Sequence, residues 1–122
     1  MIKEFLLVGF GGAIGSMLRY GCTVLCNIIE MSNHWATLFV NSVGSFLIGI
    51  IIASCVSNNF YLFAAVGLCG GFTTFSTFSA NVIEMLQNGK YGLGLTYILA
   101  SLILCIAFIM MGLYLGKSMK IN

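Results

Sequence analysis

The amino-acid sequence predicts an all-α integral membrane protein with four transmembrane helices, the third of which is broken. Hydrophobic residues make up 60% of the 122 residues and charged residues only 7%, whereas a soluble domain carries about 25% charged residues. The mean hydropathy is +1.07, and one soluble core of this size could not hide so much apolar surface. The apolar residues fall into four long stretches, so we expect a single membrane domain over residues 1–122.

Each apolar stretch is long enough to cross a bilayer, because a helix needs about 20 residues to span the hydrocarbon core. The first stretch contains Arg19, the second begins at Trp35, which suits the headgroup level, and the fourth ends at Gly116-Lys117. Lys3 before the first stretch could imitate a signal peptide, but this stretch exceeds a typical signal core and three more follow. We therefore expect membrane helices at about residues 5–26, 35–56, 60–86 and 92–115.

The positively charged residues orient this bundle only weakly. With four spans both termini lie on one side, which holds Lys3, Lys117 and Lys120, while the other side holds Lys90, together with Arg19 if its side chain reaches that surface. Such a small difference in Lys and Arg gives a weak orientation signal. We therefore hypothesise that the chain inserts in both orientations and forms an antiparallel, dual-topology homodimer with a two-fold axis in the membrane plane.

Small residues recur at four-residue spacing along the spans, a pattern that lets helix backbones approach closely in lipid. The pattern favours a compact bundle, and because four helices alone enclose little, it also favours oligomerisation. The motifs are Gly11-x-x-x-Gly15, Gly12-x-x-x-Ser16, Ser45-x-x-x-Gly49 and Gly112-x-x-x-Gly116.

The third stretch contains a polar run at residues 70–79, Gly-Gly-Phe-Thr-Thr-Phe-Ser-Thr-Phe-Ser, near the expected middle of the membrane. Polar groups at this depth are costly and are therefore candidates for function. Two glycines and five hydroxyl residues favour a helix broken near residues 70–74, which frees backbone groups that need partners. Unwound carbonyls near the midplane can hold a monovalent cation, and the N-terminus of a half-helix favours an anion. The alternative is a kinked helix whose hydroxyls bond to the preceding turn.

Phe75 and Phe78 lie in the same run and share a helix face if the second half-helix begins near Thr74. An aromatic ring has an electropositive edge, so edges turned toward a pore would offer a weak, dehydrating contact to a small anion. The alternative is that both rings only pack against neighbouring helices.

Two further polar sets lie at membrane depth. The first consists of Asn41, Ser42 and Ser45 in the second span, where Asn41, which can donate two hydrogen bonds, shares a helix face with Ser45. Tyr97, Ser101 and Cys105 follow one another at i, i+4 and i+8 in the fourth span and form a weakly polar stripe. Each set can also be explained by packing, since an interhelical hydrogen bond contributes about 0.6–2 kcal/mol to helix association.

The sequence lacks the usual residue patterns of a catalytic or metal site. Its acids are Glu4, Glu30 and Glu84, none of them in mid-span, and no carboxylate pair or nucleophile–histidine pair is visible. We therefore expect neither an enzyme nor a proton-coupled exporter, which would use an intramembrane carboxylate. His34 stands alone beside Trp35 and is expected at the interface. The cysteines are interpreted as small buried hydrophobes; they are Cys22, Cys26, Cys55, Cys69 and Cys105.

Taken together, these residues resemble the Fluc/CrcB family of fluoride channels over nearly the whole chain. The third of the matching motifs is specific when it is combined with four short spans. The motifs are Gly11-Gly12-x-x-Gly15-x-x-x-Arg19-Tyr20, Thr37-Leu38-x-Val40-Asn41-x-x-Gly44-Ser45-Phe46-x-x-Gly49 and Gly67-x-x-Gly70-Gly71-Phe72-Thr73-Thr74-Phe75-Ser76-Thr77-Phe78-Ser79.

The resemblance implies a dual-topology homodimer with two parallel fluoride pores in the inner or plasma membrane of a bacterium. Fluoride would leave the cytoplasm passively, which would lower its toxicity there. A structural sodium ion (Na+) would sit at the dimer centre on backbone carbonyls of Gly70 and Thr73 from each subunit, and Arg19 would lie near a vestibule. The residues carried over to the fluoride path are Asn41, Thr74, Phe75, Ser76, Phe78, Tyr97 and Ser101.

Two positions depart from the family pattern. Asn81 stands where the family often has a glutamate, which would make the vestibule less negative here. Cys105 stands where a hydroxyl residue is common, which affects the far end of the polar stripe.

The residues themselves leave two other functions open. A small dual-topology drug or cation exporter would fit the size and the charge distribution, but it would leave the polar run unexplained and would lack a mid-span acid. A structural subunit packed against a larger partner would leave the hydroxyl cluster unexplained as well.

Overall fold

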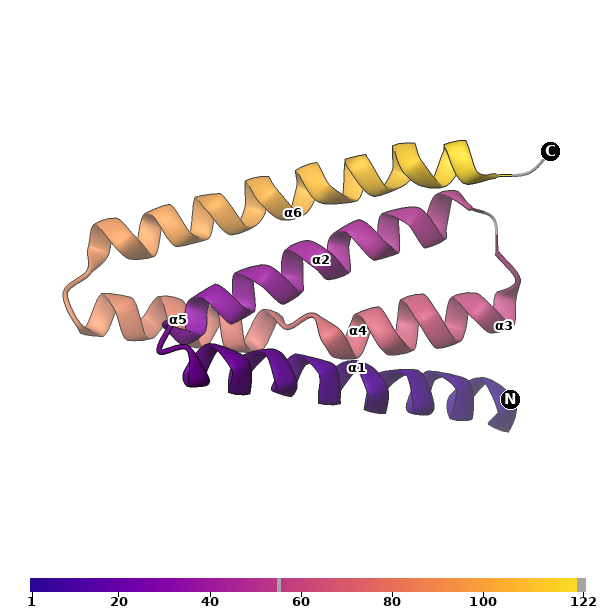
Figure 1. Ribbon diagram of the computed structural model, residues 1–122, viewed down its shortest axis with the longest axis horizontal. Helices are drawn as coiled ribbons and strands as arrows, with labels where there is room; N and C mark the ends of the chain where they lie inside the picture. Colours follow the sequence, from indigo (N-terminus) through magenta and orange to yellow (C-terminus); the bar gives the residue numbers. More distant parts are fainter. Residues whose placement is uncertain (55, 121–122) are drawn as a thin grey trace.

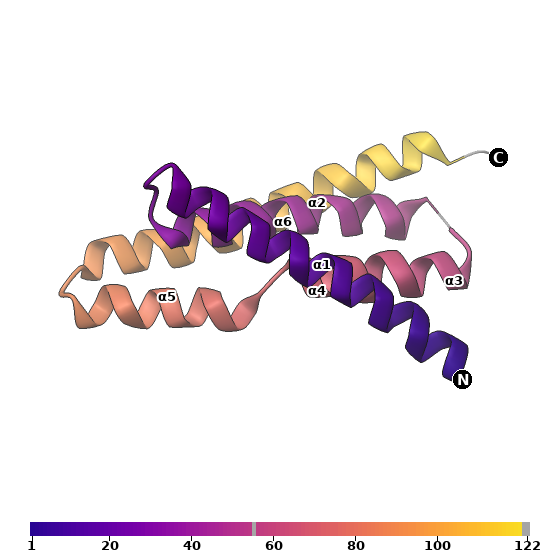
Figure 2. The same cartoon turned by 60° about the horizontal axis from the view of Figure 1, so that its bottom comes forward.

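The computed structural model describes residues 1–54 and 56–120, and the regular structure within them is helical. In this part of the chain, four helical segments are long and apolar enough to cross a membrane. They lie lengthwise along the molecule (Figure 1), and α1 crosses the others obliquely (Figure 2). The predicted all-α fold with four apolar helices is confirmed, whereas Cys55 lies outside the described residues. The segments are α1 (Ile2–Ile28), α2 (Asn33–Ala53), the interrupted segment Asn58–Gln87 and α6 (Tyr91–Met119).

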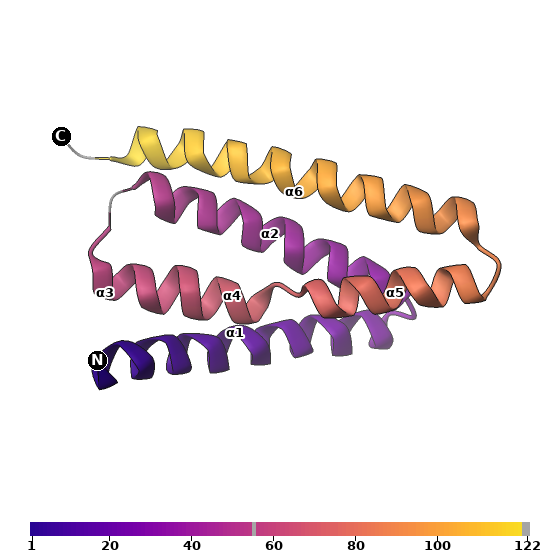
Figure 3. The same cartoon turned by 180° about the vertical axis from the view of Figure 1, so that it is seen from behind.

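The third segment is interrupted near its middle, as predicted. After Phe72 the backbone leaves the helical conformation: Thr73 has φ −86° and ψ 159°, and Thr74 has φ −150° and ψ 124°. Figure 3 shows the resulting non-helical stretch of ribbon. The first half also contains a π-helix, a wider turn that is frequent at functional sites. The pieces are α3 (Asn58–Tyr61), the π-helix η1 (Leu62–Cys69), α4 (Gly70–Phe72) and α5 (Phe75–Gln87).

Two of the connections between helices lie at the same end of the bundle. The turn from α1 to α2 and the turn from α5 to α6 lie at one end, and the start of α1 and the end of α6 lie at the other (Figure 1). Gly89 has a φ of 75°, a left-handed conformation that glycine adopts without a steric cost, and it reverses the chain after α5. Ser57 caps α3 at the other end, because its hydroxyl accepts the Phe60 N–H at 3.3 Å.

Glycines bring two pairs of helices into backbone contact. Where α2 crosses α6, a Cβ atom on Gly49 or Gly112 would lie closer than 3.0 Å to a carbonyl oxygen of the facing helix. Likewise, a Cβ atom on Gly11 or Gly15 of α1 would lie closer than 3.0 Å to a carbonyl oxygen of η1. Close packing is what drives helix association in lipid, so these crossings form the scaffold that positions the break.

Large apolar side chains cover much of the exterior. Phe5, Phe10, Ile103 and Tyr114 are among those that are mostly exposed. Such a surface suits lipid or a second protein chain better than water. The fold is therefore that of a multi-pass membrane protein.

Candidate functional site

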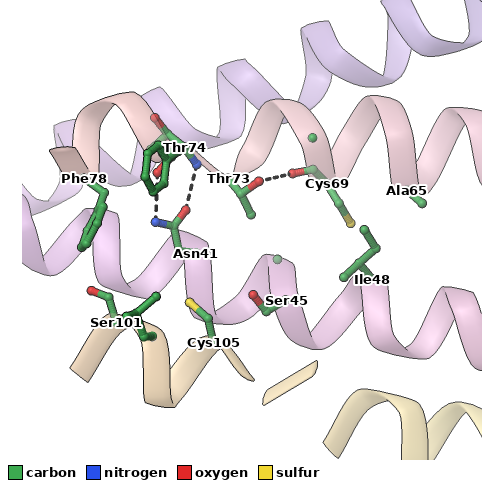
Figure 4. A pocket seen from close by; sticks show the side chains of 14 residues that line it. Asn41, Ser45, Ile48, Ala65, Cys69, Thr73, Thr74, Phe78, Ser101 and Cys105 are labelled. Carbon is green, nitrogen blue, oxygen red and sulfur yellow. Dashed lines mark hydrogen bonds between the residues drawn. The ribbon is translucent and has the colours of Figure 1, made fainter. Parts of the chain in front are cut away.

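A pair of hydrogen bonds from α2 holds the break in the third helix. The Thr74 N–H donates to Asn41 Oδ1 at 2.8 Å, and Asn41 Nδ2 donates to the Thr74 carbonyl at 3.0 Å (Figure 4). Thr74 is also the N-cap of α5, where its hydroxyl accepts the Thr77 N–H at 3.1 Å. Side chains therefore provide the partners that the backbone of Thr74 loses where the helix is interrupted.

The break leaves the carbonyl groups of residues 70–73 without their helical donors. In a continuous helix the Thr74 N–H would bond to the carbonyl of Gly70, and the Thr77 N–H would bond to that of Thr73. Both N–H groups donate instead to the side chains of Asn41 and Thr74. The carbonyl oxygens of Gly70 and Thr73 are thus available to a ligand, and Gly70 lies on the exposed surface of the single chain.

Arg19, which the resemblance places near a vestibule, contacts the break itself. Its Nε donates to the carbonyl of Gly71 at 3.0 Å. The guanidinium is always charged, so it places a fixed positive charge beside the interrupted helix, on the side that faces α1. Arg19 also lines a small cavity of about 20 Å³, enough for one water-sized ligand. Its polar neighbours there are Thr23, Thr37, Thr74 and Thr77.

A larger cavity of about 390 Å³ lies beside the break, between α2, the third segment and α6 (Figure 4). The predicted residues Asn41, Thr74 and Ser101 line it together with Ser45. Ser101 is only 6% exposed, and its hydroxyl has no hydrogen-bond partner in the part of the chain that the structure describes. Because Ser101 lines the cavity, its hydroxyl is a donor that a ligand or water inside the cavity can use. Further lining residues are Gly70, Thr73, Phe75, Phe78 and Cys105.

Three aromatic rings follow one another from this cavity toward the end of the bundle. The ring centroids of Phe75 and Phe78 are 5.7 Å apart, and those of Phe78 and Tyr97 are 5.2 Å apart. Phe78 is half-buried, but Phe75 is 78% exposed. Like the other exposed aromatic side chains, such as Tyr114 at 77%, Phe75 suits contact with lipid or with a second protein chain.

Asn81, a departure from the family pattern, links α5 to α2 and α6. Its Nδ2 donates to Thr37 Oγ1 at 3.0 Å and to the Tyr97 hydroxyl oxygen at 3.1 Å. These two hydrogen bonds use both hydrogens of the amide. In the second, the Tyr97 hydroxyl oxygen is the acceptor, so its own hydrogen is not used. A glutamate carboxylate here would accept hydrogen bonds and would not donate them. The substitution therefore leaves the Tyr97 hydroxyl free to act as a donor.

Thr37 is a site residue that sequence reasoning missed. It is 4% exposed and receives the bond from Asn81. Thr37, Asn41 and Ser45 recur every four residues, so they share one face of α2, and this periodicity could have identified Thr37 as the first member of the set.

Two of the residues predicted for the fluoride path lie outside the lining of the larger cavity. The Ser76 hydroxyl oxygen is 3.3 Å from that of Thr74, so Ser76 belongs to the cap of α5. Tyr97 contacts the Phe78 ring and the Asn81 amide.

The Thr73 hydroxyl donates back to the Cys69 carbonyl at 2.8 Å, which is the hydrogen bond that the kinked-helix alternative expects. The break and this local bond are therefore present together.

Comparison with known proteins identifies relatives over the whole of this fold. A family model described as CrcB-like protein, Camphor Resistance (CrcB), matches residues 6–113. A Thermus thermophilus protein named fluoride-specific ion channel FluC is 42% identical over 123 residues, which cover 97% of this chain and 98% of the relative. A Leptospira interrogans protein of the same name is 44% identical over 124 residues, which cover 95% and 96%. An Agrobacterium fabrum protein, also so named, is 44% identical over 119 residues, which cover 93% and 95%.

Proposed function

The chain belongs to the CrcB-like protein family, and from this premise we propose that it is a fluoride-selective ion channel. Relatives that match at least 93% of its length are named fluoride-specific ion channels. The observation that carries the proposal is the cavity beside the break, where a buried hydroxyl group has no partner in the described part of the chain. The function is then ion conduction through a membrane and not enzymatic catalysis.

Neutral hydrogen-bond donors suit the passage of a small, strongly hydrated anion. Fluoride has to exchange its water for other donors, and conduction requires that each contact is weak enough to be released. Ser101 offers a hydroxyl, Tyr97 offers a second, and Asn41 has one amide hydrogen beyond the one that it gives to Thr74. The ring edges of Phe75 and Phe78 would add weakly positive contacts between them. Because none of these groups carries a full charge, none would trap the anion.

The channel is proposed to be a homodimer. Phe75 lines the cavity beside the break and is 78% exposed in the single chain, so the path would be open on one side until another chain covers it. The weak Lys and Arg bias supports insertion in both orientations. An antiparallel dimer would then carry two equivalent paths, with its two-fold axis in the membrane plane.

A sodium ion at the dimer centre is proposed on the carbonyl oxygens of Gly70 and Thr73. These oxygens have lost their helical donors, and unwound carbonyls are suitable ligands for Na+ in membrane helices. In the described residues, no group of three or more His, Cys, Asp or Glu side chains could hold a metal instead. One chain offers too few oxygens for a full shell, so the site requires both copies. A bound Na+ would add positive charge near the fluoride path.

The transport is proposed to be passive. Fluoride would flow down its electrochemical gradient, out of the cytoplasm and across the inner or plasma membrane of a bacterium, which would lower fluoride toxicity. Glu84, which lies within a membrane segment, is exposed and close to the end of α5. It therefore does not provide the buried proton site that a proton-coupled exporter would use.

Release of ions from liposomes tests this function. Purified protein is reconstituted into liposomes loaded with fluoride or, in a matched set, with chloride, and an ion-selective electrode follows release while the pH is equal on both sides. We expect rapid fluoride release, far slower chloride release and no need for a proton gradient. A folded dimer that releases no fluoride would contradict the proposal, and release that requires a proton gradient would favour the exporter.

A further inference from the structure

A second cavity lies at the end of the bundle that holds the turns between α1 and α2 and between α5 and α6. Its volume is about 290 Å³, and the start of α2, the second half of α5 and the turn before α6 form its walls. It differs from the cavity beside the break because ionisable side chains line it, namely His34, Glu84 and Lys90. The polar side chains of Asn81 and Asn88 line it as well.

The inner wall of this cavity connects it to the proposed fluoride path. Asn81 lines the cavity and donates to the Tyr97 hydroxyl at 3.1 Å. The His34 ring packs edge-on against Tyr97, with 5.5 Å between their centroids. The Phe78 ring contacts Tyr97 as well, at 5.2 Å, and Phe78 itself lines the cavity beside the break. Side chains in mutual contact therefore lead from the second cavity to the first, through Tyr97 and then Phe78.

The charges around the second cavity cancel unless His34 is protonated. Glu84 brings one negative charge and Lys90 one positive charge, and no salt bridge within the described residues neutralises either. Tyr97, which faces the imidazole from α6, is uncharged near neutral pH. Glu30, in the turn before α2, is exposed and does not line the cavity. The N-terminus of α2 adds a partial positive charge, so protonation of the imidazole makes this end of the path clearly positive.

Resting on the proposed channel function, we propose that this cavity is the entrance for fluoride at this end and that His34 sets its attraction for the anion. An imidazole changes its charge between about pH 5 and 8. When it is neutral, the charges of Glu84 and Lys90 cancel, and fluoride gains little electrostatic free energy when it enters the cavity. When it is protonated, the local concentration of fluoride rises, and entry becomes faster.

The test is fluoride release from liposomes at equal pH on both sides, with fluoride dilute enough that release is proportional to its concentration. As the pH falls from about 8 to about 5, release by the wild-type protein should rise about two- to fivefold, the effect of one charge at close range in a wet site. The leak of hydrogen fluoride through protein-free liposomes is measured at each pH and subtracted. Wild-type release that does not change with pH would overturn the inference.

Substitutions at the entrance separate the role of His34 from other titrations. His34→Gln should keep release at its slow, high-pH level throughout, and His34→Lys should keep it at the fast level. If His34→Gln retains the wild-type pH dependence, the inference is wrong. Glu30→Gln is the matched control, because it removes an exposed acid at the same end that lies outside the cavity lining, and it should behave as the wild type does.

A charge change on the facing helix covers the case in which His34 variants do not fold. Glu84→Gln removes the negative charge from the cavity at an exposed position, so release at about pH 8 should rise about twofold or more. Unchanged release from Glu84→Gln would overturn the inference. If the folded wild-type protein releases no fluoride at any pH, the proposed channel function itself fails, and this outcome is distinct from the loss of the pH dependence alone.

Discussion

The crossing of α2 with α6 and the break in the third helix are held together by different means. At the crossing, Gly49 and Gly112 let two backbones touch because they have no side chains. At the break, Asn41 and Thr74 exchange two hydrogen bonds over 33 residues of sequence. The first contact depends on small volume and the second on matched donors and acceptors. Added volume should therefore damage the scaffold, while loss of a donor should damage the ion path and leave the scaffold intact.

The largest effect is expected from Gly112→Leu. A Cβ alone at Gly112 would already lie closer than 3.0 Å to the backbone of α2, so a leucine forces the helices apart, and overpacking costs about 1–3 kcal/mol or more. We expect little or no monodisperse protein in size-exclusion chromatography. Gly92→Leu is the matched control on the same helix, because nothing lies within 4 Å of a Cβ there. Equal yields of the two variants would show that the crossing is not the scaffold.

The next largest effect on fluoride release is expected when one of the two aromatic rings beside the cavity is removed. Phe75→Ile and Phe78→Ile keep an apolar side chain but lose the ring that lies beside the cavity. Because the rings are assigned to the anion path, we expect strongly reduced fluoride release with dimerisation intact. Release from liposomes and the elution volume of the protein measure the two properties separately. Unchanged release would assign both rings to packing alone.

A smaller loss is expected from Asn41→Leu, which keeps the branching and the number of heavy atoms of the side chain and removes its hydrogen bonds. The Thr74 N–H and carbonyl lose their partners, and a buried polar group without a partner costs about 1–3 kcal/mol. Fluoride release should fall about tenfold, since each 1.4 kcal/mol corresponds to a factor of ten, and thermal stability should fall modestly. Thr96→Val is the control, since the exposed Thr96 hydroxyl bonds only to the Gly92 carbonyl of its own helix. Equal release from both variants would mean that Asn41 does not hold the break.

Local sequence patterns predicted the elements of this fold but not their partners. Apolar length alone indicates the four spans, and the glycines and hydroxyls of residues 70–79 indicate the break. The hydrogen-bond partners are far apart in the chain: Arg19 and Gly71 are separated by 52 residues, and Asn81 and Thr37 by 44. Helical periodicity tells which residues share a face, but it does not tell which helix that face meets.

The π-helix η1 shows a second limit of the sequence. Leu62–Cys69 reads Leu-Phe-Ala-Ala-Val-Gly-Leu-Cys and is apolar on every side, so it has no periodic pattern that could distinguish a π-helix from an α-helix. The η1 backbone is in close tertiary contact with α1, where Gly11 meets it. Such a contact can override local preference, and it cannot be read from the segment itself.

The central claim is that the donors around the cavity beside the break, and not the packing of its walls, carry fluoride. Two serines provide a matched test, because Ser42 and Ser101 are both buried and neither hydroxyl has a partner within the described residues. Only Ser101 lines the cavity. Replacing either serine by alanine removes one oxygen atom, with little change in volume.

Fluoride release from liposomes is therefore compared between Ser101→Ala, Ser42→Ala and the wild type. A hydrogen bond to a charged partner contributes about 1.5–3 kcal/mol, so release by Ser101→Ala should fall about tenfold or more. Ser42→Ala should release fluoride at the wild-type rate. Both variants should remain folded dimers, since each loses an unpaired buried hydroxyl. Equal rates from the two variants would contradict the claim that the Ser101 hydroxyl meets the ion.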